Sequence, residues 1–426
     1  MFEETDKTHD KIKDYCLLLG ADATWRERSI LGAARASDSP IAIMQNTGIV
    51  NKNRFADIII TGNPGEAELA LDAVKKFEEQ SGAKPVSVIP LIEMSLAPGL
   101  KISQYYNLNY LPEFSVTAAR DKSIMKQRFL DAGLPTPQFE TFSNFDELVS
   151  QKQKFNYPVV LKPSHFGGSE GVCLARNDEE LLSAYNHTKN SMLNHARNFG
   201  LKENHFQVEE YINSTTEISV EVLNTKYGRT ILMVTDKFVT NEPYFSEIGH
   251  TVPGKYFNSS RIRSLALEAC EAINLDCGVA HVEIKISDNE EPYLLEVNAR
   301  IPGDGIADLI EKVTGYNIFE LHAKSIINDD FQFATKCLEP KGKASIAFLY
   351  AKEGRIKKIA TEVLATLPPS ITAIDITARE GDLSTKNINS HAREGSIEFY
   401  WTNDKEDDWY HIDIATDISN QLFQVK

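Results

Sequence analysis

The first 115 residues alternate short apolar runs with polar and amphipathic stretches. In Ala67–Gln80 apolar residues recur at helical spacing, at Ala70, Val74 and Phe77, before Ser81-Gly82 ends the predicted helix. Strands that alternate with helices are typical of a parallel sheet with crossover helices, so we expect an N-terminal α/β domain over residues 1–115. The predicted strands are Tyr15–Leu19, Ile41–Met44, Asp57–Thr61 and Val86–Pro90.

From Tyr157 to Asn298 the pattern changes to many short strands with two helices between them. Helices are predicted at Asp121–Ala132, where Asp121 is a good N-cap, and at Asp178–Asn194 and Ser260–Leu275. Hairpin strands with helices on one side indicate an α+β domain, and Ala344–Gln424 again shows the pattern of short strands. The predicted strands of the middle region are Pro158–Lys162, Val172–Ala175, Phe206–Glu210, Glu217–Leu223, Thr230–Phe238, Val279–Ile286 and Tyr293–Asn298.

Composition is that of an ordinary globular protein, with 42% hydrophobic and 25% charged residues. The formal net charge of −16 argues against nonspecific nucleic-acid binding and against docking on anionic lipid, because both need surplus cations. No apolar run approaches the ~20 residues of a membrane span, and Met1–Asp14 is too charged for a signal peptide. The five scattered cysteines favour a reducing cytoplasm over a disulfide framework or a structural zinc site. We therefore expect a cytoplasmic protein with neither a nucleic-acid nor a membrane partner.

Residues 279–300 predict one antiparallel hairpin with acidic residues on one face. Its register places Glu283 opposite Glu296, about 5 Å apart, and His281 opposite Asn298. Two facing glutamates repel each other, so the pair requires a compensating charge. Lys285 is expected beside Leu294, and the apolar pairs expected in the core are Ile286–Tyr293, Ile284–Leu295 and Val282–Val297.

A divalent cation is the simplest compensation for this acidic pair. Carboxylate and amide oxygens suit Mg²⁺, which completes its coordination with water and phosphate oxygens. We therefore predict Glu283, Glu296 and Asn298 as metal ligands. Arg300 shares strand parity with Glu296 and Asn298, so it can face the same ligand. The alternative is a solvent-facing acidic pair that lysines neutralise.

Lys162 ends an apolar strand, and its ammonium is therefore expected to point into a cleft. A glycine-rich loop with Gly167, Gly168 and Ser169 follows directly, and its exposed amides can wrap phosphate oxygens. The lysine precedes the glycines, so this is not a Walker A loop. An ordinary hairpin turn is the alternative interpretation.

Two further segments favour a nucleotide ligand. Lys122 begins a predicted helix, where a helix N-terminus and an ammonium together attract phosphate; alone it would be a surface lysine. Val208–Ile212 is a strand running into a turn, whose backbone groups can bind an adenine between apolar neighbours. Glu217 lies just beyond and can accept hydrogen bonds from ribose hydroxyls. The residues of the adenine edge are Glu209, Glu210, Tyr211 and Ile212.

The order of these motifs resembles the ATP-grasp superfamily over about residues 115–330. Asp236–Phe238, Glu247–Pro253 and Asn298–Gly305 further resemble the L-amino-acid ligase (dipeptide synthase) branch, although Asp304 departs from the commoner Arg-x-x-Gly-Gly form. The motifs of the superfamily, in chain order, are Asp121-Lys122, Val159–Pro163, Gly167–Gly171, Val208–Ile212, Glu217, His281–Lys285 and Leu295–Arg300.

The resemblance implies a multidomain α/β and α+β fold. An N-terminal parallel-sheet domain (1–115) would precede an ATP-grasp domain (116–330) of two α+β lobes that grip ATP. The lid lobe would span about residues 150–212. A mostly β subdomain (331–426) would pack on the ATP-grasp domain, and because dimers are common in this superfamily, a homodimer is the implied assembly.

The resemblance also assigns roles to matching residues. Lys122 and Lys162 would hold the α- and β-phosphates of ATP under a lid formed by Gly167, Gly168 and Ser169. Adenine would bind at Glu209 to Ile212 and ribose at Glu217. The metal held by Glu283, Glu296 and Asn298 would be Mg²⁺, with Mn²⁺ as an alternative.

For catalysis, the resemblance implies that Arg300 stabilises an acyl phosphate and a tetrahedral intermediate, together with Lys162. Glu247, His250 and Asp304 would contact the amino-acid substrates, and Glu93 would reach the same pocket from the first domain. His250 has the alternative of a core histidine.

The implied activity is an ATP-dependent carboxylate–amine ligase. An acid, activated as its acyl phosphate, would join an amino acid with release of ADP and phosphate. The alternatives are a carboxylase-type enzyme that activates bicarbonate and a nucleotide-binding module without catalysis.

Overall fold

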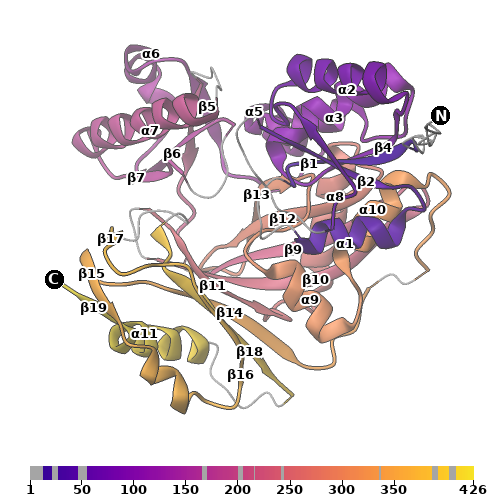
Figure 1. The fold of residues 1–426 in the computed structure, drawn as a ribbon. Coiled ribbons are helices and arrows are strands. Elements are labelled where there is room, and N and C mark those ends of the chain that lie inside the picture. The colour runs from indigo at the N-terminus through magenta and orange to yellow at the C-terminus, as the bar shows by residue number, and fades with distance from the viewer. Residues whose placement is uncertain are drawn as a thin grey trace, which may run out of the picture.

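The computed structural model describes residues 13–21, 27–46, 55–165, 170–199, 205–214, 216–240, 244–334, 337–385, 392–402 and 409–426, with the backbone alone at 195–199. An N-terminal α/β domain, a small lobe and a large antiparallel sheet with a C-terminal extension make up the molecule (Figure 1). This architecture confirms the predicted fold class. Among the helices of these residues, none is long and apolar enough to cross a membrane.

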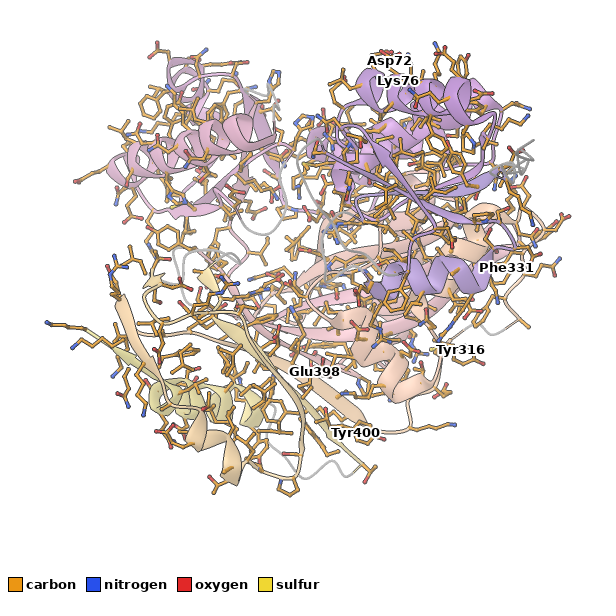
Figure 2. All side chains as sticks on the ribbon, viewed as in Figure 1. Asp72, Lys76, Tyr316, Phe331, Glu398 and Tyr400 are labelled. Carbon is orange, nitrogen blue, oxygen red and sulfur yellow. The ribbon has the colours of Figure 1, made fainter. Side chains whose placement is uncertain are left out.

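The N-terminal domain is built on a parallel sheet with the strand order β3-β2-β1-β4. Its predicted strands are confirmed to within one residue at each end, and the predicted helix is α2. Figure 2 shows Asp72 and Lys76 on the outer, exposed face of α2, whereas Ala70 and Val74 are buried against the sheet. The elements are β1 (Tyr15–Leu19), α1 (Glu27–Ala36), β2 (Ile41–Gln45), β3 (Ile58–Thr61), α2 (Ala67–Ser81), β4 (Pro85–Pro90), η2 (Glu93–Ser95), α3 (Leu96–Tyr106) and α4 (Glu113–Arg120).

The small lobe is an antiparallel sheet of order β5-β8-β6-β7 with its own hydrophobic core. Phe142, Leu161 and Phe206 from the sheet pack with Tyr185 of α7. Helix α5 (Lys122–Asp131) leads into this lobe, and Asp121 caps it as predicted, accepting from the amides of Ser123 and Ile124. The elements are β5 (Phe139–Phe142), α6 (Phe145–Ser150), η3 (Lys152–Lys154), β6 (Val159–Pro163), β7 (Cys173–Ala175), α7 (Asp178–Phe199) and β8 (Phe206–Glu210).

The large sheet has eight strands in the order β13-β12-β9-β10-β11-β14-β18-β16. Its last strands come from beyond residue 330, so one sheet extends across the predicted boundary between 330 and 331. Glu247–Val252, recognised in the sequence only as a motif, is the connecting strand β11. Before that boundary the elements are β9 (Thr216–Thr225), β10 (Gly228–Val239), β11 (Glu247–Val252), α8 (Ser260–Ala272), β12 (Gly278–Ile286), β13 (Pro292–Asn298), α9 (Ile306–Thr314) and α10 (Ile318–Ile327).

The C-terminal region is mostly β, as predicted, although an unpredicted helix, α11 (Tyr410–Leu422), precedes its last strand and packs on the large sheet. A further small sheet has the order β17-β15-β19. The elements are β14 (Lys343–Leu349), β15 (Gly354–Ile359), η4 (Thr361–Thr366), β16 (Ile371–Ile376), β17 (Leu383–Ser384), β18 (Gly395–Trp401), α11 (Tyr410–Leu422) and β19 (Phe423–Val425).

The β12–β13 hairpin follows the predicted register only at its open end. Glu283 faces Glu296 and His281 faces Asn298, as predicted, but a β-bulge follows Glu283. The extra residue reverses which side of the sheet the next side chain occupies, so Leu294 is fully buried and Leu295 lines a cleft. The observed pairs beyond the bulge are Ile284–Leu294, Lys285–Tyr293 and Ile286–Pro292, so the predicted pairs Ile284–Leu295, Lys285–Leu294 and Ile286–Tyr293 are wrong.

His322 on α10 connects the large sheet to the N-terminal sheet. Its Nδ1 accepts from the amide of Val279 on β12 at 2.9 Å, and its Nε2 donates to the carbonyl of Pro90 on β4 at 3.1 Å. Burial lowers the pKa of His322 from 6.5 to about 4. Only a neutral imidazole can accept through Nδ1 while it donates through Nε2.

We expect acid to weaken this connection before it protonates most carboxylates. Because the folded-state pKa lies below the unfolded one, the contribution is complete above about pH 6.5 and is lost as the pH falls towards 4, by about 3 kcal/mol in total. Urea unfolding between pH 7.5 and 4.5 measures this loss. In His322→Gln, whose amide does not titrate, the unfolding free energy should depend less steeply on pH. His205→Gln, at an exposed site, should keep the pH dependence of the wild type. Equal slopes in all three proteins would contradict this assignment.

Candidate active site

A cleft between the small lobe and the large sheet gathers most of the predicted site residues. Charged side chains and apolar side chains both line this cleft. Gly167, Gly168 and Ser169 lie outside the described residues. The predicted residues that line the cleft are Lys122, Lys162, Glu209, Glu210, Tyr211, Ile212, Glu217, Glu247, Glu283 and Glu296.

The cleft also has apolar walls, which the motifs alone did not reveal. A flat ring can pack between such walls while the neighbouring backbone groups bond to its edge. Leu295 reaches the cleft only because of the bulge in β13, and that bulge has no sequence signature. The apolar and aromatic residues of the lining are Pro137, Val160, Pro163, Val172, Ile212, Phe245 and Leu295.

Lys122 and Glu296 form a buried ion pair on the floor of the cleft. The Lys122 Nζ lies 3.0 Å from Glu296 Oε2, and the Asn298 amide donates to Glu296 Oε1 at 2.8 Å. Burial alone would lower the pKa of Lys122, but Glu296 and then Glu93 raise it. Both groups are therefore charged, and Asn298, placed just behind Glu296, does not itself line the cleft.

Lys237 on β10 is the central cation of a second acidic group. It lies 2.7 Å from Glu247, 3.1 Å from Glu217 and 3.2 Å from Glu283. Burial alone would lower the pKa of Lys237, but the carboxylates of Glu247, Glu283 and Glu217 raise it well above its usual range. The sequence offered one signal for this residue, because Asp236–Phe238 belongs to the segments that resemble the L-amino-acid ligase branch, but no role was predicted for Lys237.

Glu283 is oriented by a layer of polar groups behind it. His281 donates to Glu221 through Nδ1 at 2.8 Å and to Glu283 through Nε2 at 3.1 Å. Burial alone would lower the pKa of His281, but hydrogen bonds to Glu221 and Glu283 raise it to about 9. Glu221, fully buried, also accepts from Ser219 and Thr235. His281 therefore orients Glu283, which is a predicted metal ligand.

The two facing glutamates fit a hard cation in their donor set. Glu283 and Glu296 are cross-strand partners with side chains only 17% and 13% exposed, and both line the cleft. Carboxylate oxygens with an adjacent amide are the ligands Mg²⁺ takes in proteins. The alternative interpretation was a solvent-facing pair of glutamates neutralised by lysines. Lysines do neutralise Glu283 and Glu296, but the two side chains are largely buried and do not face solvent.

Glu209 joins two lysines beneath the cleft. Its Oε1 lies 2.5 Å from Lys162 Nζ and 3.2 Å from Lys126 Nζ, and Gln207 donates to the same oxygen at 2.6 Å. The Lys126 ammonium also donates to the hydroxyl of Thr136 at 3.0 Å. The Glu209 carboxylate thus holds Lys162 in position, and its own side chain is occupied by this contact. Lys126 was not predicted because it lies on a polar helix with no motif.

Other predicted residues lie around the cleft without lining it. Arg300 is half-buried after β13 and donates to the carbonyl of Ile301 at 3.1 Å. Glu93 is buried at the start of η2, where it contributes to raising the pKa of Lys122. Glu93 was predicted to reach the substrate pocket; it does not line the cleft and acts on Lys122 from the N-terminal domain.

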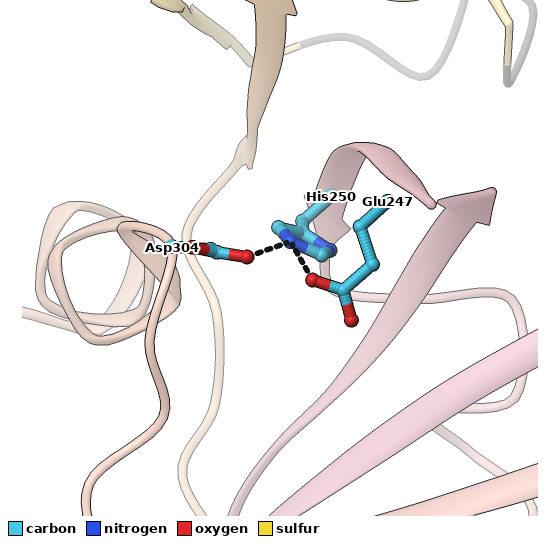
Figure 3. A group of neighbouring side chains, drawn as sticks. All are labelled: Glu247, His250 and Asp304. Carbon is cyan, nitrogen blue, oxygen red and sulfur yellow. Dashed lines mark ion pairs between the residues drawn. The ribbon is translucent and has the colours of Figure 1, made fainter. Parts of the chain in front are cut away.

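Glu247, His250 and Asp304 form a compact group beside the cleft (Figure 3). Glu247 lines the cleft, and His250 is fully buried between the two carboxylates. Arg393 from the C-terminal region binds both oxygens of Asp304, at 2.8 and 3.0 Å. Arg393 belongs to no sequence motif, so only the fold reveals that it meets Asp304.

Comparison with known proteins agrees with this geometry. Residues 155–308 match the family model of the ATP-grasp domain. The chain is 26% identical to the alanine–anticapsin ligase of Bacillus subtilis over 271 residues, covering 60% of this chain and 56% of that protein. It is 24% identical over 311 residues to the carbamoyl phosphate synthase large chain of Thermoanaerobacter sp., covering 68% and 26%. This chain thus spans a quarter to just over half of these relatives.

Among solved structures, the fold is similar to that of an L-amino acid ligase from Bacillus licheniformis. The TM-score is 0.77 at 18% sequence identity, and the superposition covers 97% of this chain and 98% of the other. The similarity therefore extends over the N-terminal domain, the small lobe, the large sheet and the C-terminal region together.

Proposed function

Since residues 155–308 match the family model of the ATP-grasp domain, we propose that this protein is an ATP-dependent carboxylate–amine ligase. The reaction would join an amino acid, or an amino-acid-like carboxylic acid, to a second amino acid. The observation that carries the proposal is that Glu283 faces Glu296 in the same cleft as Lys122 and Lys162. The names of two similar proteins, an alanine–anticapsin ligase and an L-amino acid ligase, support the substrate class.

ATP would enter with its base between the apolar walls of the cleft. The backbone of Glu209 to Ile212 would bind the adenine edge, Glu217 the ribose, and Lys122 and Lys162 the phosphates. Each of the two lysines now contacts a glutamate, so triphosphate oxygens would replace carboxylates as their partners. Glu296 would thereby become available to a cation. Lys126 would remain as the ion-pair partner of Glu209.

Mg²⁺, or Mn²⁺, held by Glu283, Glu296 and Asn298 would neutralise the β- and γ-phosphates when bound. Oxide is too poor a leaving group for a carboxylate to react directly with an amine. Transfer of the γ-phosphoryl group would give an acyl phosphate, which the amine of the second substrate attacks. Loss of phosphate then leaves the amide and ADP. The lysines and Arg300 would position these groups and stabilise the negative charge that develops on oxygen.

Arg300 and Glu247 would take different parts in the reaction. Arg300 follows Glu296 and Asn298 on the chain, and Glu247 shares Lys237 with Glu283. Arg300 would therefore face the reacting carboxyl, and Glu247 with His250 and Asp304 would border the amino-acid substrates. Glu93 would act from the N-terminal domain through Lys122.

The test is an ADP-release screen over pairs of amino acids, including nonstandard acids, with mass spectrometry of the products. We expect ADP and phosphate only when both an acid and an amine substrate are present, together with a condensation product. AMP and pyrophosphate would overturn the mechanism. ADP release that depends on bicarbonate without an amine would assign a carboxylase-type activity, and tight ATP binding with no turnover would assign a binding module.

A further inference from the structure

The group of Glu247, His250 and Asp304 has a buried histidine without hydrogen-bond partners. His250 is 0% exposed, and neither ring nitrogen has a hydrogen-bond partner. An unpartnered buried polar group is costly, at roughly 1–3 kcal/mol, so this imidazole requires another explanation. A core histidine, such as His322, has both nitrogens bonded. His250 therefore differs from the core histidine considered in the sequence.

We propose that Glu247, His250 and Asp304 bind a divalent transition-metal ion of the Zn²⁺ class, separate from the cation that accompanies ATP. His250 Nε2 lies 3.7 Å from Glu247 Oε2 and 3.7 Å from Asp304 Oδ2. One atom from each residue lies within 4.8 Å of the others. Metal bonds of 2.0–2.2 Å place tetrahedral ligands roughly 3.4 Å apart, so small side-chain movements suffice. Figure 3 shows His250 directed between the two carboxylates.

The cations already present still leave carboxylate oxygens facing His250, although Arg393 also lies 3.7 Å from Glu247 Oε2. Lys237 contacts Glu247 through Oε1, whereas Oε2 is the atom nearest His250. Arg393 donates hydrogen bonds to both oxygens of Asp304. Each carboxylate oxygen has two lone pairs, so Oδ2 can still bind a metal. Arg393 would then orient Asp304 from behind, as partners of metal ligands commonly do.

The local charge also favours an added cation. Burial, and then the proximity of Asp304, contribute to raising the pKa of Glu247 despite the opposing effect of Lys237. Two carboxylates within a buried group therefore still repel each other. Asp304 adopts a left-handed backbone conformation with φ of 55°, between Gly303 and Gly305. A metal ion would relieve the repulsion and give His250 a partner.

The type of metal follows from the ligands. Imidazole with carboxylates suits Zn²⁺ better than Mg²⁺, which prefers oxygen ligands alone. Three protein ligands leave one coordination position open in a tetrahedral site. Since Glu247 lines the cleft, that position is available to a ligand entering from it. The site does not depend on the proposed ligase activity, because its evidence is confined to these side chains and Arg393.

The test uses full-length protein without a histidine tag, stripped with a chelator and free of ATP and amino acids. After equilibration with Zn²⁺ and dialysis, we expect about one equivalent of bound zinc by elemental analysis. Replacing Zn²⁺ with Co²⁺ should give the visible absorption bands of a cobalt ion with nitrogen and oxygen ligands. His250→Ala and the isosteric Asp304→Asn should each weaken binding by about 100-fold or more.

Matched variants separate this site from others. His205→Ala, at an exposed histidine, and Glu296→Gln, at the proposed ATP-metal site, should both keep the bound zinc. Far-UV circular dichroism checks folding, and Asp304→Asn serves as the test if His250→Ala unfolds. Zinc content below about a tenth of an equivalent in the wild type, or unchanged binding in Asp304→Asn, would overturn the proposal. Because no nucleotide or substrate is present, neither result depends on ligase activity.

Discussion

Glu296→Gln is expected to lower kcat for amide formation by about 10³-fold or more while the protein stays folded. Glutamine keeps the shape of the side chain and the contact with Asn298, but it removes the charge that would bind the cation. It also breaks the ion pair with Lys122, for which Glu93 remains as a nearby acidic group. Single-turnover formation of ADP, measured at saturating Mg²⁺, gives the effect on the chemical step.

The matched control lies on the same hairpin. Glu291→Gln removes an exposed carboxylate paired with Arg261 at the turn and should leave kcat unchanged within about twofold. If Glu296→Gln retains full activity, Glu296 is not a metal ligand and the interpretation of the hairpin is wrong. If both variants lose activity equally, the loss comes from the hairpin's stability and not from the charge at position 296.

The acidic pair could be predicted because it depends on a short-range rule. Strand pairing within a hairpin follows from alternation and the turn, and it correctly placed Glu283 opposite Glu296. The same rule failed beyond the pair, because a bulge shifts the register by one residue without a marker in the sequence. Leu295 consequently lies in the cleft and not in the core.

Residues that act over long sequence distances could not be predicted. Lys237 meets Glu217 and Glu247 only because β10 lies between β9 and β11 in the sheet. Arg393 reaches Asp304 across 89 residues of sequence, and no motif contains both. The helices that were not predicted are α1, α3, α4, α6, α9, α10 and α11. The sequence motifs therefore identified individual site residues, whereas the fold showed which charged side chains contact them.

The second large effect is on the stability of the protein and concerns the buried group of Lys126, Glu209 and Lys162. We expect Glu209→Gln to destabilise the protein by about 3–5 kcal/mol, because it leaves two buried ammonium groups without a carboxylate. The side chains of Lys126 and Glu209 are 0% and 4% exposed, so water cannot replace the lost partner. Urea unfolding at pH 7.5 measures the difference, and the exposed neighbour Glu210→Gln should stay within about 0.5 kcal/mol of the wild type.

Replacing Lys126 in place of Glu209 should change stability much less. The difference between the two substitutions is the sharper test. Burial, assisted by the nearby Lys162, lowers the pKa of Lys126 to about 8 despite the attraction of Glu209, so its charge is held at a cost. Lys126→Met removes that cost and leaves Glu209 paired with Lys162, and we expect a change of less than about 1 kcal/mol or a gain in stability. In the double variant, Lys126→Met should recover part of the loss caused by Glu209→Gln, because only one unpaired lysine remains. Strictly additive effects in this cycle would mean that Lys126 and Glu209 do not interact, and the position of Lys162 beside the cleft would then need another support.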